Sequence, residues 1–326
     1  MTTVLKVAGL KTHFHTRDGV VKAVDDISFS LERGEIVGLA GESGSGKTVT
    51  GFSLIGLVDA PGRIVAGSVR LNGTELVGMS ERELRKRRGR EISMIFQDPI
   101  ATLNPMLTIG QQMQMAIAAH ERLSRRAADA RCADLLEKVG IPSARERLRA
   151  YPHEFSGGMR QRVAIAIALL HRPSVIVADE PTTALDVSIQ AQILWRMRQL
   201  ARETGTAMIW ISHDLAVVSS LASRLLVMYA GRVVEEGPTA RVLRDPRHPY
   251  TAGLIGSLPA SAAPGKPLNQ VPGTTPSLLS LPPGCPFAPR CARAADICRN
   301  EPELERHEDR SWRCFRPVGV QERARA

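Results

Sequence analysis

The sequence predicts an α/β fold built around a mostly parallel β-sheet. Two observations lead to this prediction. Through about the first 240 residues, apolar runs of strand length alternate with helical patterns, which is typical of a parallel sheet covered by helices. In addition, a glycine-rich loop of the form G-x-x-x-x-G-K-[ST] follows one apolar run and precedes a helical one, as it does in proteins built on such sheets.

The expected parallel strands are short and apolar on both faces. They are Glu35–Ala40, Ile92–Phe96, Ser174–Ala178, Ala207–Ser212 and Arg224–Tyr229. Two earlier segments, Ala23–Leu31 and Gly67–Leu71, alternate apolar and polar residues instead, as strands with one exposed face do. These two segments are therefore expected to be half-exposed strands.

The remaining segments divide into a helical and an irregular part. Residues from about 98 to 170 have mainly helical patterns, with a break near Tyr151-Pro152. From Asp245 onward the pattern changes, and Pro and Gly crowd residues 259 to 289, which indicates irregular structure or linker. The predicted organisation is a main domain over residues 1–245, with a helical subdomain over about 98–170, and a C-terminal extension over 246–326.

Composition limits the classes of function. Aromatic residues make up only 4% of the 326, which argues against a nucleic-acid surface that stacks bases. No apolar run approaches the roughly 18 residues of a membrane helix, and the first residues lack the apolar core of a signal peptide; we expect a cytosolic chain. The net charge is +10, and its densest run is Arg82–Arg90. That run is interpreted as a solvated helical face, with direct phosphate binding as the alternative.

The glycine-rich loop is the strongest motif. Its residues are Gly41, Glu42, Ser43, Gly44, Ser45, Gly46, Lys47 and Thr48. Such a loop wraps tightly, so that successive backbone N–H groups point at phosphate oxygens. Lys47 would neutralise the β- and γ-phosphates, and the Thr48 hydroxyl would hold Mg²⁺. The loop therefore predicts a nucleotide site, of a kind that unrelated enzymes such as kinases and GTPases also use.

Carboxylates follow a later apolar strand. Asp179 and Glu180 come directly after Val175–Ala178, where the end of a buried parallel strand would meet the nucleotide. Asp179 is expected to support Mg²⁺, and Glu180 to orient and deprotonate an attacking water. His213, after another strand, and Gln97, after the strand near Ile92, could contact the γ-phosphate; each alone is as well explained as an ordinary polar residue at a strand end.

A second anion-binding turn precedes an apolar helix. Ser156, Gly157 and Gly158 stand at its start, where a hydroxyl and free N–H groups can bind phosphate. A Ser-Gly-Gly sequence would cap any helix, so its order relative to the other motifs matters. In the sequence, it lies after the glycine-rich loop and before Asp179 and Glu180.

Six features follow one another along the chain: GESGSGKT, Gln97, FSGGM, VIVADE, ALD with Asp186, and His213. Together they resemble the motif set of ABC ATPases over about residues 4 to 245. The resemblance implies a P-loop NTPase fold of ABC type with an antiparallel β subdomain and a helical subdomain. It implies a head-to-tail dimer, in which Ser156–Gly158 of one subunit faces the nucleotide of the other. It also implies that Gln97 assists Mg²⁺ and that Phe14 stacks on adenine. Phe155 and Met159 depart from the common LSGGQ signature but leave its Ser-Gly-Gly core intact.

Two further segments resemble the oligopeptide/dipeptide branch of ABC importers. They are DPIATLNPMLTIGQQM after Gln97 and the tail that begins at His248-Pro249-Tyr250-Thr251. The resemblance implies an ATPase that powers peptide import from the cytoplasmic face of the membrane. Its implied partners are a second, related ATPase subunit, two permeases and an extracytoplasmic binding protein. Nickel, glutathione or another small solute is the alternative cargo, and a nucleic-acid-associated ATPase is the rival class.

Four of the five cysteines lie in the last 42 residues: Cys285, Cys291, Cys298 and Cys314. Their spacing matches neither the short-spaced ferredoxin pattern nor a zinc ribbon. Four thiolates in a segment with little apolar core still indicate a metal centre that helps it to fold. The importer resemblance implies a [4Fe–4S] cluster, with zinc, disulfides or free thiols as alternatives. Cys132, in a helical pattern, is expected to be a small core residue.

Overall fold

The computed structural model describes residues 2–182, 185–258 and 270–319. Within them, one sheet of eight strands has the order β11-β12-β10-β9-β3-β8-β7-β6. Its strands are β3 (Ile36–Ala40), β6 (Ile92–Ile95), β7 (Val175–Asp179), β8 (Ala207–Ser212), β9 (Arg224–Tyr229), β10 (Arg232–Pro238), β11 (Glu305–His307) and β12 (Arg310–Trp312). The five expected apolar strands are β3, β6, β7, β8 and β9, and all four pairings among them are parallel. This part of the prediction is confirmed.

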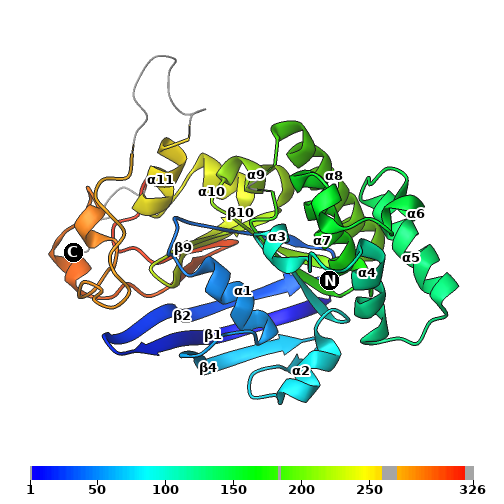
Figure 1. Ribbon diagram of the computed structural model, residues 1–326. Helices are drawn as coiled ribbons and strands as arrows, with labels where there is room; N and C mark the ends of the chain where they lie inside the picture. The colour runs from blue at the N-terminus through cyan, green and yellow to red at the C-terminus, as the bar shows by residue number, and fades with distance from the viewer. Residues whose placement is uncertain (1, 183–184, 259–269, 320–326) are drawn as a thin grey trace.

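The second sheet is antiparallel and has the order β2-β1-β4-β5. Its strands are β1 (Thr3–Thr16), β2 (Gly19–Glu32), β4 (Gly62–Leu71) and β5 (Thr74–Glu75). Buried side chains alternate with partly exposed ones along most of β2, as expected for a strand with one wet face. The inner face packs against α1 (Lys47–Ile55), which lies between the two sheets (Figure 1).

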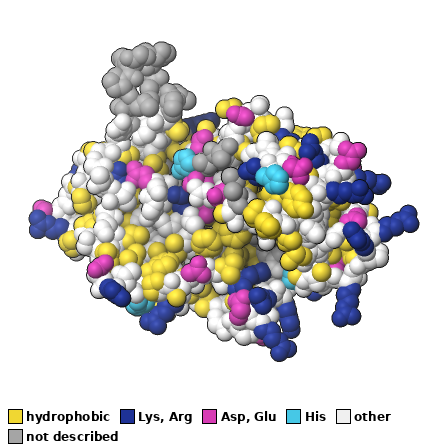
Figure 2. All heavy atoms as spheres, in the orientation of Figure 1, with side chains coloured by type: hydrophobic (Ala, Val, Ile, Leu, Met, Phe, Trp, Pro, Cys, Tyr) yellow, Lys and Arg dark blue, Asp and Glu magenta, His cyan; other side chains and the backbone are white. Residues whose placement is uncertain are grey.

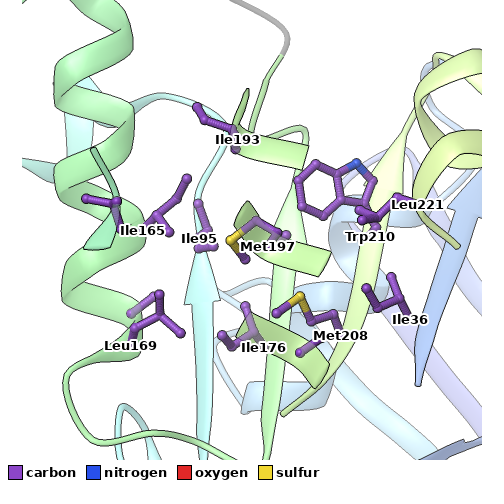
Figure 3. Close-up of a cluster of buried hydrophobic side chains, with 14 of the residues drawn as sticks. Ile36, Ile95, Ile165, Leu169, Ile176, Ile193, Met197, Met208, Trp210 and Leu221 are labelled. Atoms are coloured by element: carbon purple, nitrogen blue, oxygen red, sulfur yellow. The ribbon is translucent and has the colours of Figure 1, made fainter. Parts of the chain in front are cut away.

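The other face of the large sheet is covered by helices. These helices are α3 (Pro99–Thr102), α4 (Ile109–Ala118), α5 (Arg125–Lys138), α6 (Ala144–Arg147), α7 (Gly157–Leu169), α8 (Val187–Thr204), α9 (Leu215–Leu221), α10 (Thr239–Arg244) and α11 (Pro249–Gly256). Helix α2 (Glu81–Arg87) lies instead beside the smaller sheet, where its Leu84 packs against the same cluster as α1. Ile165 of α7 and Met197 of α8 point at Ile95 of β6 in one buried cluster (Figure 3). Helices α3 to α7 occupy the predicted helical region, and Cys132 is fully buried among them.

Helix α2 carries much of the basic run Arg82–Arg90. Ser80 and Glu83 form a capping box at its start, and none of its residues is buried. Figure 2 shows Lys and Arg side chains projecting over the position of this helix. The run is therefore a solvated helical face, as interpreted from the sequence.

The C-terminal segment is more ordered than its sequence suggests. Strands β11 and β12 form a hairpin, and β12 pairs with β10 at the edge of the large sheet. Two 3₁₀ helices, Ala288–Arg290 and Asp296–Arg299, precede them; a third, Pro152–Glu154, lies at the predicted break near Tyr151. The expectation of irregular structure thus misses one hairpin, because β12 is a three-residue strand, Arg-Ser-Trp, with no apolar run.

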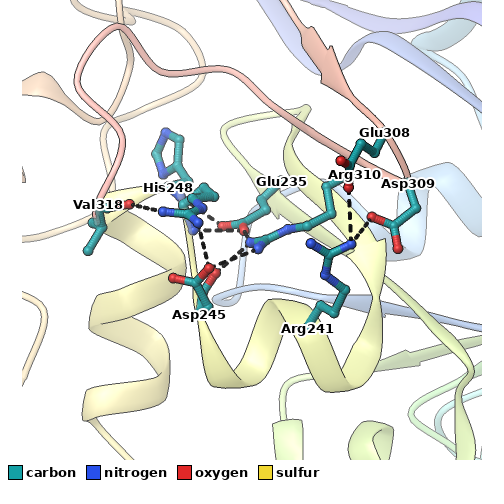
Figure 4. Close-up of polar contacts among 9 residues, drawn as sticks. Glu235, Arg241, Asp245, His248, Glu308, Asp309, Arg310 and Val318 are labelled. Carbon is teal, nitrogen blue, oxygen red and sulfur yellow. Dashed lines mark hydrogen bonds and ion pairs between the residues drawn. The ribbon is translucent and has the colours of Figure 1, made fainter. Parts of the chain in front are cut away.

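A buried ion pair fastens this hairpin to the sheet (Figure 4). Arg310 Nη2 lies 2.7 Å from Glu235 Oε1, and the exposed fractions of the two side chains are 4% and 0%. The Glu235 carboxylate also accepts hydrogen bonds from the backbone N–H groups of Arg247 and His248, each at 2.8 Å. Three donors satisfy a carboxylate that water cannot reach, and all three come from residues that follow β10 in the chain.

In the parts of the chain that the structure describes, no helix combines the length and apolar character that crossing a bilayer requires.

Candidate nucleotide site

The glycine-rich loop joins β3 to α1, as the motif requires. Gly46, immediately before the helix, has φ of 100°, a conformation that side chains other than glycine rarely adopt. A Cβ atom at this position would come within 2.1 Å of the Ala23 carbonyl oxygen. Gly44 also has positive φ and faces open space, and both Ser43 and Gly44 are exposed at the tip of the loop. The loop is therefore a tight turn whose backbone is open to a ligand at its tip.

Lys47 lies against the inside of this loop. Its Nζ donates to the carbonyl oxygens of Gly41 at 2.8 Å and Glu42 at 2.9 Å. Burial lowers the pKa of its ammonium group, and the carboxylates of Glu180 and Asp179 oppose that shift. A cation held at the N-terminus of a helix, next to the backbone of a tight turn, is suited to bind the phosphates of a nucleotide.

Two oxygen donors that could bind Mg²⁺ lie side by side. Thr48 Oγ1 donates to Asp179 Oδ1 at 3.2 Å. Burial raises the pKa of Asp179 to about 6, although the hydrogen bond from Thr48 opposes part of the shift. A hydroxyl and a carboxylate are hard oxygen ligands of the kind that Mg²⁺ prefers when it also binds phosphates. Both residues were expected here, and both lie at the predicted position.

Glu180 is held between the other two expected side chains. Gln97 Nε2 donates to Glu180 Oε2 at 3.1 Å, and His213 Nδ1 lies 3.0 Å from Glu180 Oε1. The residue has φ of 44°, an uncommon conformation outside glycine that often marks functional sites. The structure thus brings together three residues from the ends of β6, β7 and β8, with Asp179 next in the chain.

The Ser-Gly-Gly segment forms the start of α7. Ser156 is the N-cap residue, and its side chain accepts from the Met159 N–H at 3.3 Å. A Cβ on Gly157 would meet nothing within 4 Å, whereas Gly158 packs near Leu185 and Ile189. The start of the helix is therefore open to a molecule outside this chain. Asp186 begins α8 and is exposed, so this expected residue also lies beside the same surface.

Phe14 has a packing role that the sequence does not reveal. The ring lies against Gly62 of β4, where an added Cβ would come within 2.5 Å of it, and next to Val58. The side chain is only half-buried. Its stacking on adenine stays a prediction.

The four C-terminal cysteines are brought together. All of them line one cavity of about 20 Å³, together with His248 and Phe287. Burial raises the pKa of Cys314 to about 12 and that of Cys285 and Cys291 above the ordinary value, and it lowers the pKa of His248 to about 3. Soft thiol donors around one small cavity match the chemistry of a thiolate-bound metal. Even so, no three His, Cys, Asp or Glu side chains in the described residues are arranged as metal ligands, so the structure gives the iron–sulfur expectation no direct support.

One group of contacts escaped sequence analysis. The carboxylate of Glu42, in the phosphate loop, pairs with Arg290 at 2.7 Å. The backbone N–H of Glu42 donates to the Tyr250 hydroxyl at 2.8 Å. The tail resembles a family segment, and nothing in its local sequence pattern joins it to the loop. The only available signal was that Glu42 is a carboxylate in a loop that binds anions, which requires a compensating cation from elsewhere.

Sequence comparisons agree with this geometry. The family model described as "ABC transporter" matches residues 24–183, and the model "Oligopeptide/dipeptide transporter, C-terminal region" matches residues 234–298. The chain is 49% identical to the oligopeptide transport ATP-binding protein OppD of Escherichia coli (strain K12), over 97% of this chain and 94% of the relative. It is 46% identical to the oligopeptide transport ATP-binding protein AppD of Bacillus subtilis (strain 168), over 97% of each.

Solved structures give the same result for the fold. The ATP-binding cassette MJ0796, in a dimer bound to ADP and Pi, has a TM-score of 0.66 and 26% identity, over 72% of this chain and 98% of that one. The protein cbiO1 of Clostridium perfringens, described as part of the ABC transporter complex cbiONQ, has a TM-score of 0.63 and 26% identity, over 75% of this chain and 92% of that one. These matches, together with the glycine-rich loop and the contacts of Glu180, show that the chain belongs to the ATP-binding subunits of ABC transporters.

Proposed function

We propose that this chain binds and hydrolyses ATP to power the import of di- and oligopeptides through partner permeases. The observation that carries the proposal is the position of Glu180, held by Gln97 and His213 next to the Thr48–Asp179 pair. A fixed carboxylate beside a magnesium site is what the deprotonation of an attacking water needs. The peptide cargo rests on the names of the relatives and on the matched C-terminal region.

In the proposed reaction, Lys47 and the loop N–H groups bind the phosphates, and Thr48 and Asp179 hold Mg²⁺ with the help of Gln97. Glu180 takes a proton from water as the water oxygen attacks the γ-phosphorus. The bond between that phosphorus and the bridging oxygen breaks, and ADP leaves with the electron pair. His213 would stabilise the charge on the γ-phosphate.

A second ATPase subunit would complete each site. The exposed start of α7, with Ser156 and Gly157, would face the nucleotide of the partner, and Asp186 would lie at the same interface. We propose a heterodimer with a related ATPase at the cytoplasmic face of the membrane, below two permeases that an extracytoplasmic binding protein supplies. Residues 1–245 would form the catalytic domain, with its helical part near 98–170, and residues 246–326 the extension.

Uptake of labelled di- and oligopeptides by cells that lack this chain tests the cargo. We expect uptake to fall to background without the chain and to return when the native chain is supplied. Nickel and glutathione uptake, measured in the same cells, should not change. Loss of nickel or glutathione uptake with normal peptide uptake would contradict the peptide assignment and replace it with the other cargo.

We also propose that Cys285, Cys291, Cys298 and Cys314 hold a [4Fe–4S] cluster, since their thiols line one cavity. Such a cluster would act as a cross-link that holds the short elements of the tail together. Chain purified without oxygen should contain iron and sulfide in equal amounts, and Cys298→Ser should lose most of both. Cys132→Ala is the matched control, because Cys132 lies in the helical core; it should keep the iron. Zinc without iron in the native chain would contradict the cluster.

A further inference from the structure

The phosphate loop is bound from outside by the C-terminal segment. Arg290 donates from both terminal nitrogens to the Glu42 carboxylate, Nη1 to Oε2 at 2.7 Å and Nη2 to Oε1 at 3.0 Å. Thr275 Oγ1 donates to the same carboxylate at 2.9 Å. The Tyr250 hydroxyl accepts from the Glu42 N–H at 2.8 Å. Both the side chain and the backbone of one loop residue are therefore fixed by residues beyond 245.

Arg290 is itself firmly held. Its guanidinium lies 5.8 Å from the centre of the Tyr229 ring and 5.9 Å from that of Phe287, and its Nε donates to the Pro272 carbonyl at 2.8 Å. The side chain is only 6% exposed. A planar guanidinium group that is already fixed in position loses little conformational entropy when it binds a carboxylate through two hydrogen bonds.

The charge of Glu42 matters because the loop binds a polyanion. Hydrogen bonds from Arg290 hold the pKa of Glu42 below its usual value, so the carboxylate is ionised at neutral pH. Its backbone carbonyl also accepts from Lys47 Nζ at 2.9 Å, which places the residue directly beside the phosphate-binding cation. An unpaired carboxylate at this point would repel the triphosphate.

We propose that Arg290 and Tyr250 are positioning residues, which hold Glu42 and neutralise its charge and thereby set the affinity of the phosphate loop for ATP. The inference rests on the proposed nucleotide site and adds to it a control by the C-terminal segment. Neither residue is proposed to touch ATP. Their effect passes through Glu42 to the shape and the electrostatic potential of the loop.

The test measures binding of ATP to the full-length chain by equilibrium titration, at low and at high salt. We expect Arg290→Met to raise the Kd for ATP about tenfold at low salt, because it leaves Glu42 charged and unpaired. The increase should shrink at high salt, which screens the repulsion. Tyr250→Phe, which removes the acceptor of the Glu42 N–H, should raise the Kd by a smaller factor.

The double variant Glu42→Gln/Arg290→Met separates positioning from folding. Because it removes the carboxylate together with its partner, we expect ATP affinity to return to within about threefold of native. A merely structural role of Arg290 would give no such rescue, and an Arg290→Met chain that binds ATP normally would also overturn the inference. If Arg290→Met does not fold, Arg290→Lys should keep most of the affinity and Arg290→Gln should lose it; equal affinity of those two would overturn the proposal.

Arg313→Met is the matched control. Arg313 is another buried arginine of the same segment, and it pairs with Asp26 of β2 at 2.7 Å instead of with the phosphate loop. Arg313→Met should leave the Kd for ATP unchanged. If it raised the Kd as much as Arg290→Met does, any loosening of the C-terminal segment would weaken ATP binding, and the specific role of Arg290 would be refuted. Failure of the native chain to bind ATP would refute the nucleotide site itself, so the two failures are distinguishable.

Discussion

Glu180→Gln is expected to bind ATP with near-native affinity and to hydrolyse it about 10² to 10⁴ times more slowly. The amide is close to the carboxylate in shape, so the contacts to Gln97 and His213 can persist. It cannot take a proton from water at neutral pH, and the attacking water then lacks its base. Phosphate release from the assembled transporter, with the change in every copy, measures the effect.

A second glutamate provides the control for this change. Glu236 is similarly shielded, since its side chain is 17% exposed and that of Glu180 is 15% exposed, and it pairs with Arg224 on the large sheet. Glu236→Gln should keep native turnover. Native turnover in the Glu180→Gln complex would show that another group activates the water, and loss of ATP binding would show that Glu180 acts on binding.

Arg310→Met is expected to lower the free energy of unfolding by about 3 kcal/mol. The change leaves the fully buried Glu235 carboxylate with two backbone donors and no cation. It also removes the hydrogen bond from Arg310 to the Asp245 carbonyl at 2.6 Å. Urea denaturation with linear extrapolation measures the difference.

Two companion variants test the cause. Arg241 pairs with Asp309 in the same hairpin, but both side chains are about half exposed (52% and 45%), so Arg241→Met should cost less than about 1 kcal/mol. Glu235→Gln in the Arg310→Met chain should recover part of the stability, because a neutral amide costs less to bury than an unpaired charge. Equal losses for Arg241 and Arg310 would contradict a special role for the buried pair.

The parts of the fold that the sequence predicts are those with local patterns. Strands such as Val175–Asp179 are apolar throughout and are buried on both faces, so their length and type can be recognised directly. The phosphate loop and the Ser156 turn each follow from backbone chemistry over a few residues. Their order then identifies the family, which in turn predicts Gln97 and His213; alone, either residue would be ambiguous.

The parts that escaped prediction depend on partners far apart in the chain. β12 has no apolar run, and its place in the sheet depends on the ion pair between Arg310 and Glu235. Similarly, Glu42 and Arg290 are 248 residues apart, and no pattern within either segment encodes their contact. Thiol spacing shows the same limit, because four cysteines at irregular intervals share a cavity only after the tail has folded.

The contact between Glu42 and Arg290 also has a consequence for biosynthesis. The ribosome completes the phosphate loop well before it has made Tyr250 and Arg290. A nascent or prematurely terminated chain of 245 residues contains every ATP-site motif, yet its Glu42 lacks the arginine and its β10 lacks the neighbouring β12. The loop reaches its final electrostatic surroundings only after Arg290 has been made and folded into place, so a chain that stops before Arg290 differs from the native subunit at the site itself.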